Sequence, residues 1–222
     1  MRKRYIHQQP EGALMRTAMK ICCISDTHHA HRKTIIPEGD VLIHAGDGVG
    51  PTMRGLEEFL NWFVTHPHPV KIFIGGNTDS VLEQQPVAVR SLIPSSVVYL
   101  ENEGINVNGV RFWGSPIVPR FLDISFNADR GSAIKKYWDL IPEETDVLIT
   151  HSPPMGILDK TARGASVGCL ELLNRVQEIQ PKLHFFGHVH ESYGKYISNG
   201  TQFYNAAYMN RGNAPWCVEF NN

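Results

Sequence analysis

Five segments of the sequence place aspartate, asparagine or histidine directly after a short apolar run. They are Asp26-Thr27-His28, Gly46-Asp47, Gly76-Asn77-Thr78-Asp79, His151 and Gly187-His188-Val189-His190. Carboxylate, imidazole and amide ligands together suit Mn²⁺, Fe or Zn²⁺, and the lack of cysteine in the set argues against a structural zinc site. The segments therefore predict a metal centre assembled from distant parts of the chain.

The number of candidate ligands indicates more than one ion. Seven side chains qualify, namely Asp26, His28, Asp47, Asn77, His151, His188 and His190. They are too many for one ion, whereas a carboxylate shared by two ions about 3.5–4 Å apart accommodates them, and such pairs of ions catalyse phosphoryl chemistry. In the Asp-x-His and His-x-His pairs we expect both side chains on the same side of an extended segment, because side chains alternate along a strand.

Each segment also has a simpler structural interpretation. A single aspartate or histidine at a strand end often only anchors a loop through a hydrogen bond to the backbone. Asp47 could cap a turn, Asn77 could adopt left-handed geometry, and His188 and His190 could be surface residues. Five such segments at five strand ends are much harder to explain in this way, so we favour the metal centre.

The apolar runs before these segments are typical of buried strands. Each has four to six residues and ends in glycine or polar residues, and they cover residues 20–25, 41–45, 70–74, 146–150 and 183–186. Because the carboxyl ends of such strands meet at one edge of an α/β sheet, the ligands are expected there. Two helices are predicted between strands, one capped by Thr52 and continuing to about Val64, and one over residues 167–179.

Two Asn-Gly pairs predict β-hairpins. They are Asn108-Gly109 and Asn199-Gly200, each between two alternating runs. A type I′ turn needs positive φ at both central residues, which asparagine and glycine tolerate. Hairpins beside βα units predict α/β layers with more than one sheet.

The composition narrows the classes of function. The 222 residues carry a formal net charge of −1, which argues against a broad electrostatic surface for nucleic acid or an anionic membrane. Hydrophobic residues make up 42% of the chain, which is enough for a packed core. No run reaches the roughly 18 apolar residues that a membrane span requires. We therefore expect no membrane partner and no nucleic-acid partner.

The cysteines and the N-terminal residues give two further expectations. No C-x-x-C pair is present, and we predict four free thiols in a reducing compartment, hence a cytoplasmic location, for Cys22, Cys23, Cys169 and Cys217. Arg2, Lys3 and Arg4 are not followed by an apolar segment, so they do not predict a secretory signal. We expect residues 1–18 to be a flexible extension and residues 19–222 to form a single domain.

The order of the five segments resembles that of the calcineurin-like metallophosphoesterases. The flanking residues, such as 39–47 (Gly-Asp-Val-Leu-Ile-His-Ala-Gly-Asp) and 149–154 (Ile-Thr-His-Ser-Pro-Pro), are closer still to the metallophosphoesterase-domain-containing (MPPED) group and its bacterial relatives. The similarity extends from about Met19 to Phe220. It implies an α/β fold, a four-layer αββα sandwich of two mixed sheets, with two divalent metal ions at one end of the sheets.

The same resemblance implies a role for each candidate ligand. The first ion takes Asp26, His28 and His190, and the second takes Asn77, His151 and His188, while Asp47 bridges the two. Asn77 and His151 are also expected to contact the substrate. In the family a metal-bridging hydroxide attacks phosphorus in line, and the cations neutralise the phosphate oxygens. We expect Mn²⁺ in both sites, with Fe or Zn²⁺ as alternatives.

One position departs from the family pattern. The family usually reads Gly-Asn-His-Asp/Glu, whereas this chain has Thr78 in place of the histidine that can protonate the leaving oxygen. General acid catalysis is typically worth about 10²–10⁴-fold, so substrates with good leaving groups should suffer least from its absence. Four histidines could substitute, although each is more typical of an exposed or supporting residue, namely His29, His31, His44 and His66. His44 best suits a supporting role, because it lies on the strand that leads to Asp47.

These observations leave three hypotheses of function. The first is a cytoplasmic dinuclear-metal phosphodiesterase that acts on small phosphodiesters, with cyclic nucleotides as candidate substrates. The second is a metal- and nucleotide-binding scaffold whose catalysis weakened when Thr78 replaced histidine, although a scaffold has no need to retain seven ligands. The third is a protein phosphatase or a nuclease, and the near-neutral charge disfavours the nuclease. The oligomeric state stays open.

Overall fold

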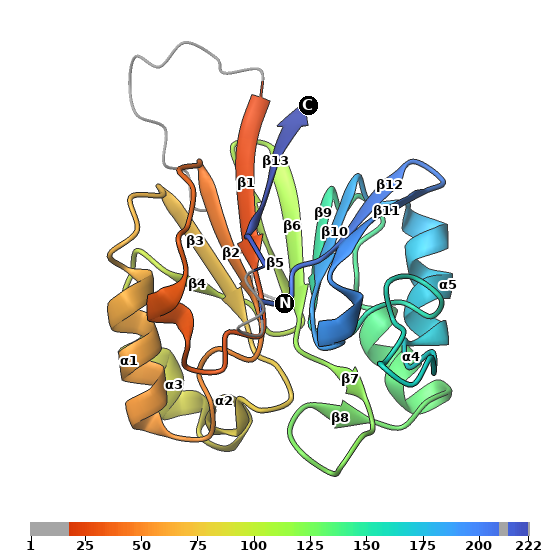
Figure 1. Cartoon of the computed structure of the whole chain (residues 1–222), viewed down its shortest axis with the longest axis horizontal. Coiled ribbons are helices and arrows are strands. Elements are labelled where there is room, and N and C mark those ends of the chain that lie inside the picture. The colour runs from red at the N-terminus through yellow and green to blue at the C-terminus, as the bar shows by residue number, and fades with distance from the viewer. Residues whose placement is uncertain (1–17, 209–212, 222) are drawn as a thin grey trace.

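The computed structural model describes residues 18–208 and 213–221, which form two sheets packed face to face (Figure 1). The first sheet has the strand order β13-β1-β2-β3-β4. Its members are β1 (Ala18–Ile24), β2 (Val41–Ala45), β3 (Val70–Ile74), β4 (Val98–Tyr99) and β13 (Trp216–Asn221). Strands β1 to β4 run parallel to one another, and β13 is antiparallel to β1. Except for Ala18, the predicted N-terminal extension lies outside the described residues.

The second sheet has the order β11-β12-β10-β9-β6-β5. Its members are β5 (Glu103–Val107), β6 (Val110–Ser115), β9 (Val147–Thr150), β10 (Leu183–Phe186), β11 (Gly194–Ser198) and β12 (Thr201–Asn205). The four inner strands are parallel, and the two edge strands are antiparallel to their neighbours. A small parallel pair, β7 (Val118–Pro119) and β8 (Asn127–Ala128), was not predicted from the sequence.

Helices cover the outer face of each sheet, so the predicted four-layer αββα sandwich is confirmed (Figure 1). One outer layer contains α1 (Met53–Phe63), α2 (Ser80–Gln84) and α3 (Pro86–Leu92), and the other contains α4 (Ser132–Trp138) and α5 (Leu170–Ile179). The described residues also contain two single-turn 3₁₀ helices, η1 (His31–Lys33) and η2 (His190–Ser192). No helix among the described residues is long and apolar enough to span a membrane.

Alternation along the strands divides the core between the layers. On β1, Ile21 and Cys23 face the other sheet and pack in one cluster with Phe185, while Cys22 faces the helical layer with Phe59 of α1. This is the pattern of a strand that is buried on both faces, which explains why the apolar runs were nearly continuous.

The predicted helix cap and both predicted turns are found at the expected residues, and one predicted helix begins later than expected. The Thr52 hydroxyl accepts the Gly55 N–H at 3.1 Å and caps α1. Both Asn-Gly pairs form turns with positive φ at both residues, between β5 and β6 and between β11 and β12. The second predicted helix begins at Leu170 rather than at residue 167. Residues 167–169 lie outside the helix, and Cys169 is extended, with its N–H donating to Pro153 O at 2.9 Å.

The prediction of four free thiols is wrong. Cys22 of β1 and Cys217 of β13 form a disulfide, whereas Cys23 and Cys169 are free and buried. The two partners are 195 residues apart in the chain but lie directly opposite each other in the antiparallel register of β1 and β13. Cysteine spacing alone gave no sign of this pairing. The argument from free thiols to a reducing compartment is therefore lost, and the cytoplasmic location stays a prediction.

Candidate metal centre

The seven predicted ligands come together at one edge of the sandwich. The strands β1, β2 and β3 of one sheet and β9 and β10 of the other all end at this edge, which lies at the bottom of Figure 1. The residues that follow each strand are therefore brought to the same end of the two packed sheets.

Left-handed backbone turns aim the side chains of these segments. Positive φ angles occur at Asp26 (55°), His28 (40°), Asp47 (57°) and His188 (67°). The expectation of extended Asp-x-His and His-x-His segments was therefore wrong, because the chain turns sharply at each strand end. Non-glycine residues rarely adopt this region, and each such turn costs about 1–3 kcal/mol, which contacts with the surroundings must offset. Backbone bonds supply part of that support, since the Asp26 N–H donates to Gly46 O at 2.9 Å.

One group of ligands consists of Asp26, His28 and His190. His190 Nε2 lies 3.1 Å from Asp26 Oδ1 and 3.3 Å from His28 Nε2, and the three ligand atoms are close enough to hold one ion. Asp26 is fully buried, whereas the His28 and His190 side chains are 32% and 21% exposed. The exposed side of the centre is therefore formed by this group.

A second group surrounds His151. Its Nε2 lies 3.0 Å from Asn77 Oδ1 and 3.4 Å from Asp47 Oδ2, and its Nδ1 lies 2.9 Å from Ala45 O. The contact with Ala45 O orients the ring and leaves Nε2 for a ligand bond, as is usual for metal-binding histidines. The ring of His188 lies 5.0 Å from that of His151, centre to centre.

Asp47 lies between the two groups. Its Oδ2 is 3.4 Å from His151 Nε2 on one side and 3.8 Å from His28 Nε2 on the other. Its Oδ1 accepts the backbone N–H of Thr78 at 2.9 Å. The position of this carboxylate fits the bridging role that the family resemblance implied.

The charges of the centre call for a cation. Burial alone would raise the pKa of Asp47, but the charge and hydrogen bond of His151, with the charge of His28, hold it well below its usual value. The pKa of His151 is in turn raised to about 10, because the charge of Asp47 overcomes the opposing effect of burial. Asp26 is also held below its usual pKa; its burial is outweighed by the hydrogen bond from His190.

Within residues 18–208 and 213–221, only histidines form ion pairs with the carboxylates of Asp26 and Asp47. Buried charge of this kind needs an opposite charge, and divalent cations would supply it while displacing protons from the histidines. The donor set of carboxylates, imidazoles and one amide fits Mn²⁺, Fe or Zn²⁺.

Asp79 is a supporting residue to which the sequence gave no role of its own. Its fully buried carboxylate accepts backbone N–H groups from the turns after β2 and β3, namely those of Asp47, Gly48, Val49, Gly50 and Gly76. Two signals in the sequence pointed to it, namely its place two residues after Asn77 and its match to the acidic residue that ends the family pattern.

Glycine is required at two positions beside the carboxylates. A Cβ atom added to Gly187 would lie 2.0 Å from Asp26 Oδ2, and one added to Gly76 would lie 2.2 Å from Asp47 Oδ1. Any larger residue would therefore push a carboxylate out of place.

Thr78 and the candidate substitute histidines lie in different surroundings. Thr78 contributes its backbone N–H to Asp47 and is half-buried. The His44 ring lies behind the site, with Nε2 3.0 Å from Thr27 Oγ1. His31 and His66 pack against Trp62 of α1, at 4.9 and 4.8 Å between ring centres. His29 is exposed and lies beside Gly50.

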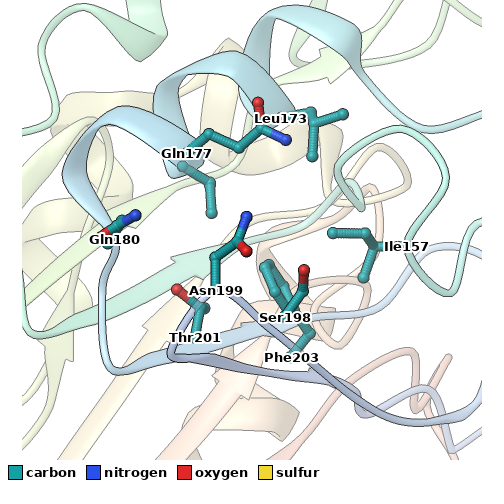
Figure 2. Close-up of a pocket in the computed structure, with 9 residues that line it drawn as sticks. Ile157, Leu173, Gln177, Gln180, Ser198, Asn199, Thr201 and Phe203 are labelled. Atoms are coloured by element: carbon teal, nitrogen blue, oxygen red, sulfur yellow. The ribbon is translucent and has the colours of Figure 1, made fainter.

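A small pocket elsewhere on the molecule is separate from this centre. It lies between α5 and the turn joining β11 to β12, where Gln177, Gln180 and Asn199 surround a floor that includes Phe203 (Figure 2). Its volume of about 20 Å³ is enough for roughly one water molecule. None of the seven candidate ligands lines it.

Comparisons with known proteins show which family the chain resembles. The family model for calcineurin-like phosphoesterase matches residues 19–192. The human metallophosphoesterase domain-containing protein 1 is 39% identical over 217 residues, which cover 85% of this chain and 65% of that protein. The UPF0046 protein K07C11.7 of Caenorhabditis elegans is 37% identical over 209 residues, which cover 88% of this chain and 71% of that protein.

A solved structure shares the fold at low sequence identity. The phosphopantetheinyl hydrolase of Mycobacterium tuberculosis superposes with a TM-score of 0.62 at 13% identity, over 90% of this chain and 95% of that one. At that identity the similarity supports the architecture alone.

The chain spans 65% of the length of the human relative, slightly less than two thirds.

Proposed function

Since the chain belongs to the calcineurin-like phosphoesterase family, we propose that it is a metal-dependent phosphoesterase that hydrolyses small phosphodiesters, with cyclic nucleotides among the substrates. One observation carries the proposal, namely the position of the Asp47 carboxylate between the His28 and His151 rings, at 3.8 and 3.4 Å. A buried carboxylate in that position suits two cations that share a ligand.

The ligand assignment follows the two groups. Asp26, His28 and His190 would hold one divalent cation, Asn77, His151 and His188 the other, and Asp47 both. When bound, such cations supply positive charge to phosphate oxygens and lower the pKa of water. The contact of His151 with Ala45 O and that of the Asp47 N–H with Asp79 support this assignment, because they would orient these two residues before a cation binds. Asn77 and His151 would also face the substrate phosphate. We propose Mn²⁺ as the cation, with Fe or Zn²⁺ as alternatives.

Thr78 bears on the leaving group rather than on the choice between monoester and diester. A hydroxyl at this position has no useful pKa for protonating a leaving oxygen, so an aryl diester, whose phenolate needs little protonation, should be hydrolysed faster than a cyclic nucleotide, whose ribose oxygen leaves as an alkoxide. The histidines at positions 31, 44 and 66 pack beside aromatic rings or behind the site and are poorly placed to replace the acid.

A non-catalytic scaffold that binds metal and nucleotides is the second candidate, and the threonine at position 78 is the observation that favours it. The deciding experiment loads the purified, metal-free protein with Mn²⁺ and measures hydrolysis of bis(p-nitrophenyl) phosphate and of a cyclic nucleotide. We expect two bound ions and turnover. Two bound ions and bound nucleotide without turnover would support the scaffold instead, and a protein that binds no Mn²⁺ would contradict both.

A further inference from the structure

The segment that follows β12 joins the two sheets beside the metal centre. The backbone N–H of Ala206 donates to Phe186 O at 2.7 Å, while its O accepts the N–H of Ser25 at 2.9 Å. The Tyr208 N–H donates to Ser25 O at 2.8 Å. This segment therefore holds the end of β1, just before Asp26, against the end of β10, just before the segment with His188 and His190.

Asn205 is the last residue of β12, directly before this segment, and is fully buried. Its side-chain Nδ2 donates to Val189 O at 2.9 Å and to Leu158 O at 3.2 Å, and its Oδ1 accepts the Ala207 N–H at 3.1 Å. A carboxamide offers two donor hydrogens and one acceptor oxygen, and all of them are used here. The group is thus held in one orientation.

Val189 lies between two proposed ligands of different ions, His188 and His190. The turn is irregular, because His188 has a φ of 67° and the Val189 N–H donates to Gly187 O at 2.8 Å. The Val189 carbonyl accepts a second bond, from the Ser192 N–H at 3.1 Å. Two side chains from outside the turn therefore hold its backbone. The Asp26 carboxylate accepts the His188 N–H at 2.9 Å, and Asn205 fixes the next carbonyl, that of Val189, just before His190.

We propose that Asn205 is a positioning residue of the metal centre. Its carboxamide sets the turn that aims His188 and His190, and so it sets the affinity for both cations. The inference rests on the proposed function, in that it takes these two histidines as ligands. It adds a residue from outside the five strand-end segments.

Two substitutions test this role by measuring the binding of Mn²⁺ to the metal-free full chain, by calorimetry and by the electron paramagnetic resonance signal of a coupled Mn²⁺ pair. Asn205→Ala removes both donors. Asn205→Asp keeps the shape but turns a carboxylate oxygen toward the Val189 and Leu158 carbonyls. We expect each to weaken Mn²⁺ binding at least tenfold and to reduce the coupled signal.

A matched control separates positioning from stability. Val107→Ala alters a buried residue on the edge strand β5, and no proposed ligand comes directly after this strand in the chain. The substitution should lower the melting temperature without changing Mn²⁺ affinity. Wild-type Mn²⁺ affinity in both Asn205 variants would overturn the proposal, as would an equal loss of affinity in Val107→Ala.

A milder variant covers the case in which the Asn205 variants do not fold. Trp216→Phe removes the indole N–H that donates to the Asn205 backbone O at 3.0 Å, and it leaves a smaller ring against Tyr193 and Tyr204. We expect a loss of Mn²⁺ affinity of twofold or more, and an unchanged affinity would overturn the proposal. A wild-type protein that binds no Mn²⁺ would instead contradict the proposed function. Two bound ions in the wild type without any turnover would contradict the activity while leaving the role of Asn205 supported.

Discussion

Asp79 holds the turn that carries Asp47, since its Oδ2 accepts the Asp47 backbone N–H at 2.9 Å. The same oxygen accepts the Gly76 N–H at 2.9 Å, so one buried carboxylate joins the turn after β2 to the turn after β3. Asp47 has a φ of 57°, a conformation that persists only where neighbouring groups hold it. The bridging position of Asp47 therefore depends on a residue that is not itself a proposed ligand.

The first prediction concerns Asp79→Asn. An amide places an NH₂ group where at least two backbone N–H groups now donate to a carboxyl oxygen, so those hydrogen bonds are lost and the donors face one another. We expect the free energy of unfolding of the metal-free protein to fall by about 2 kcal/mol, and Mn²⁺ affinity to fall with it. Denaturant unfolding and Mn²⁺ titration measure the two effects. Asp139→Asn, which removes only an exposed pair with Lys135, is the control and should change stability by less than about 0.5 kcal/mol. Equal effects of the two substitutions would contradict the role of Asp79.

The second prediction concerns the shared carboxylate. Asp47→Ala removes the anion that both cations would share, so we expect loss of both ions or of nearly all turnover. Metal analysis after gel filtration and hydrolysis of bis(p-nitrophenyl) phosphate check this, with Asp139→Ala as the exposed control. If Asp47→Ala keeps two ions and near-normal turnover, the assignment of the bridge is wrong.

The third prediction separates the two sites. His190 contacts Asp26 and His28, whereas the His188 ring lies against His151. His190→Ala should therefore weaken the first site more than the second, and His188→Ala should do the reverse. Stepwise Mn²⁺ titration of each variant gives the two affinities. Identical binding profiles for the two variants would contradict the division of ligands.

The fourth prediction concerns the Cys22–Cys217 bond. A disulfide between residues 195 apart restricts the unfolded chain strongly, and such bonds typically contribute about 2–4 kcal/mol to stability. We expect a reductant to lower the melting temperature of the wild type, and Cys217→Ser to have the lower value with or without reductant. Cys169→Ser, which removes a free thiol, should keep the response to reductant. A wild type that is insensitive to reductant would contradict a stabilising bond.

The parts of the fold that the sequence could predict depend on local signals. Thr52 caps a helix through a contact three residues away, and Asn108-Gly109 forms a turn through its own backbone preferences. The metal ligands could be found because each follows an apolar strand. The turns at Asp26 and His188 could not, because their left-handed conformations are held by bonds from other strand ends.

Relationships between distant segments account for what was missed. Nothing near Cys22 in the sequence indicates that β13 lies beside it, and nothing near Val189 indicates Asn205. Asp79 is only two residues after Asn77 in the sequence, yet its role depends on a turn that is some 30 residues earlier in the chain. Such contacts follow from the packing of the two sheets and become visible only once both are in place.

The fifth prediction concerns the missing acid at Thr78. An aryl diester leaves as a weakly basic phenolate and needs little protonation, whereas an alkyl monoester such as AMP leaves as a strongly basic alkoxide and needs a donor. We therefore expect the Mn²⁺-loaded wild type to prefer bis(p-nitrophenyl) phosphate to AMP. Thr78→His keeps the backbone N–H that donates to Asp47 Oδ1 and adds a ring that can carry a proton.

The measurement is kcat/KM for paired aryl and alkyl substrates in the wild type and in Thr78→His, at equal metal content. The added histidine should raise the value for the alkyl substrate by about tenfold or more, within the range that general acids supply, and should change the aryl value little. An equal change on both substrates would show that the ring alters binding or metal occupancy and not proton transfer. A wild type that prefers AMP would show that another group already donates the proton. His29 would then be the first residue to replace, because it is exposed and directly follows His28 in the chain, while the other three candidate histidines are packed against aromatic rings.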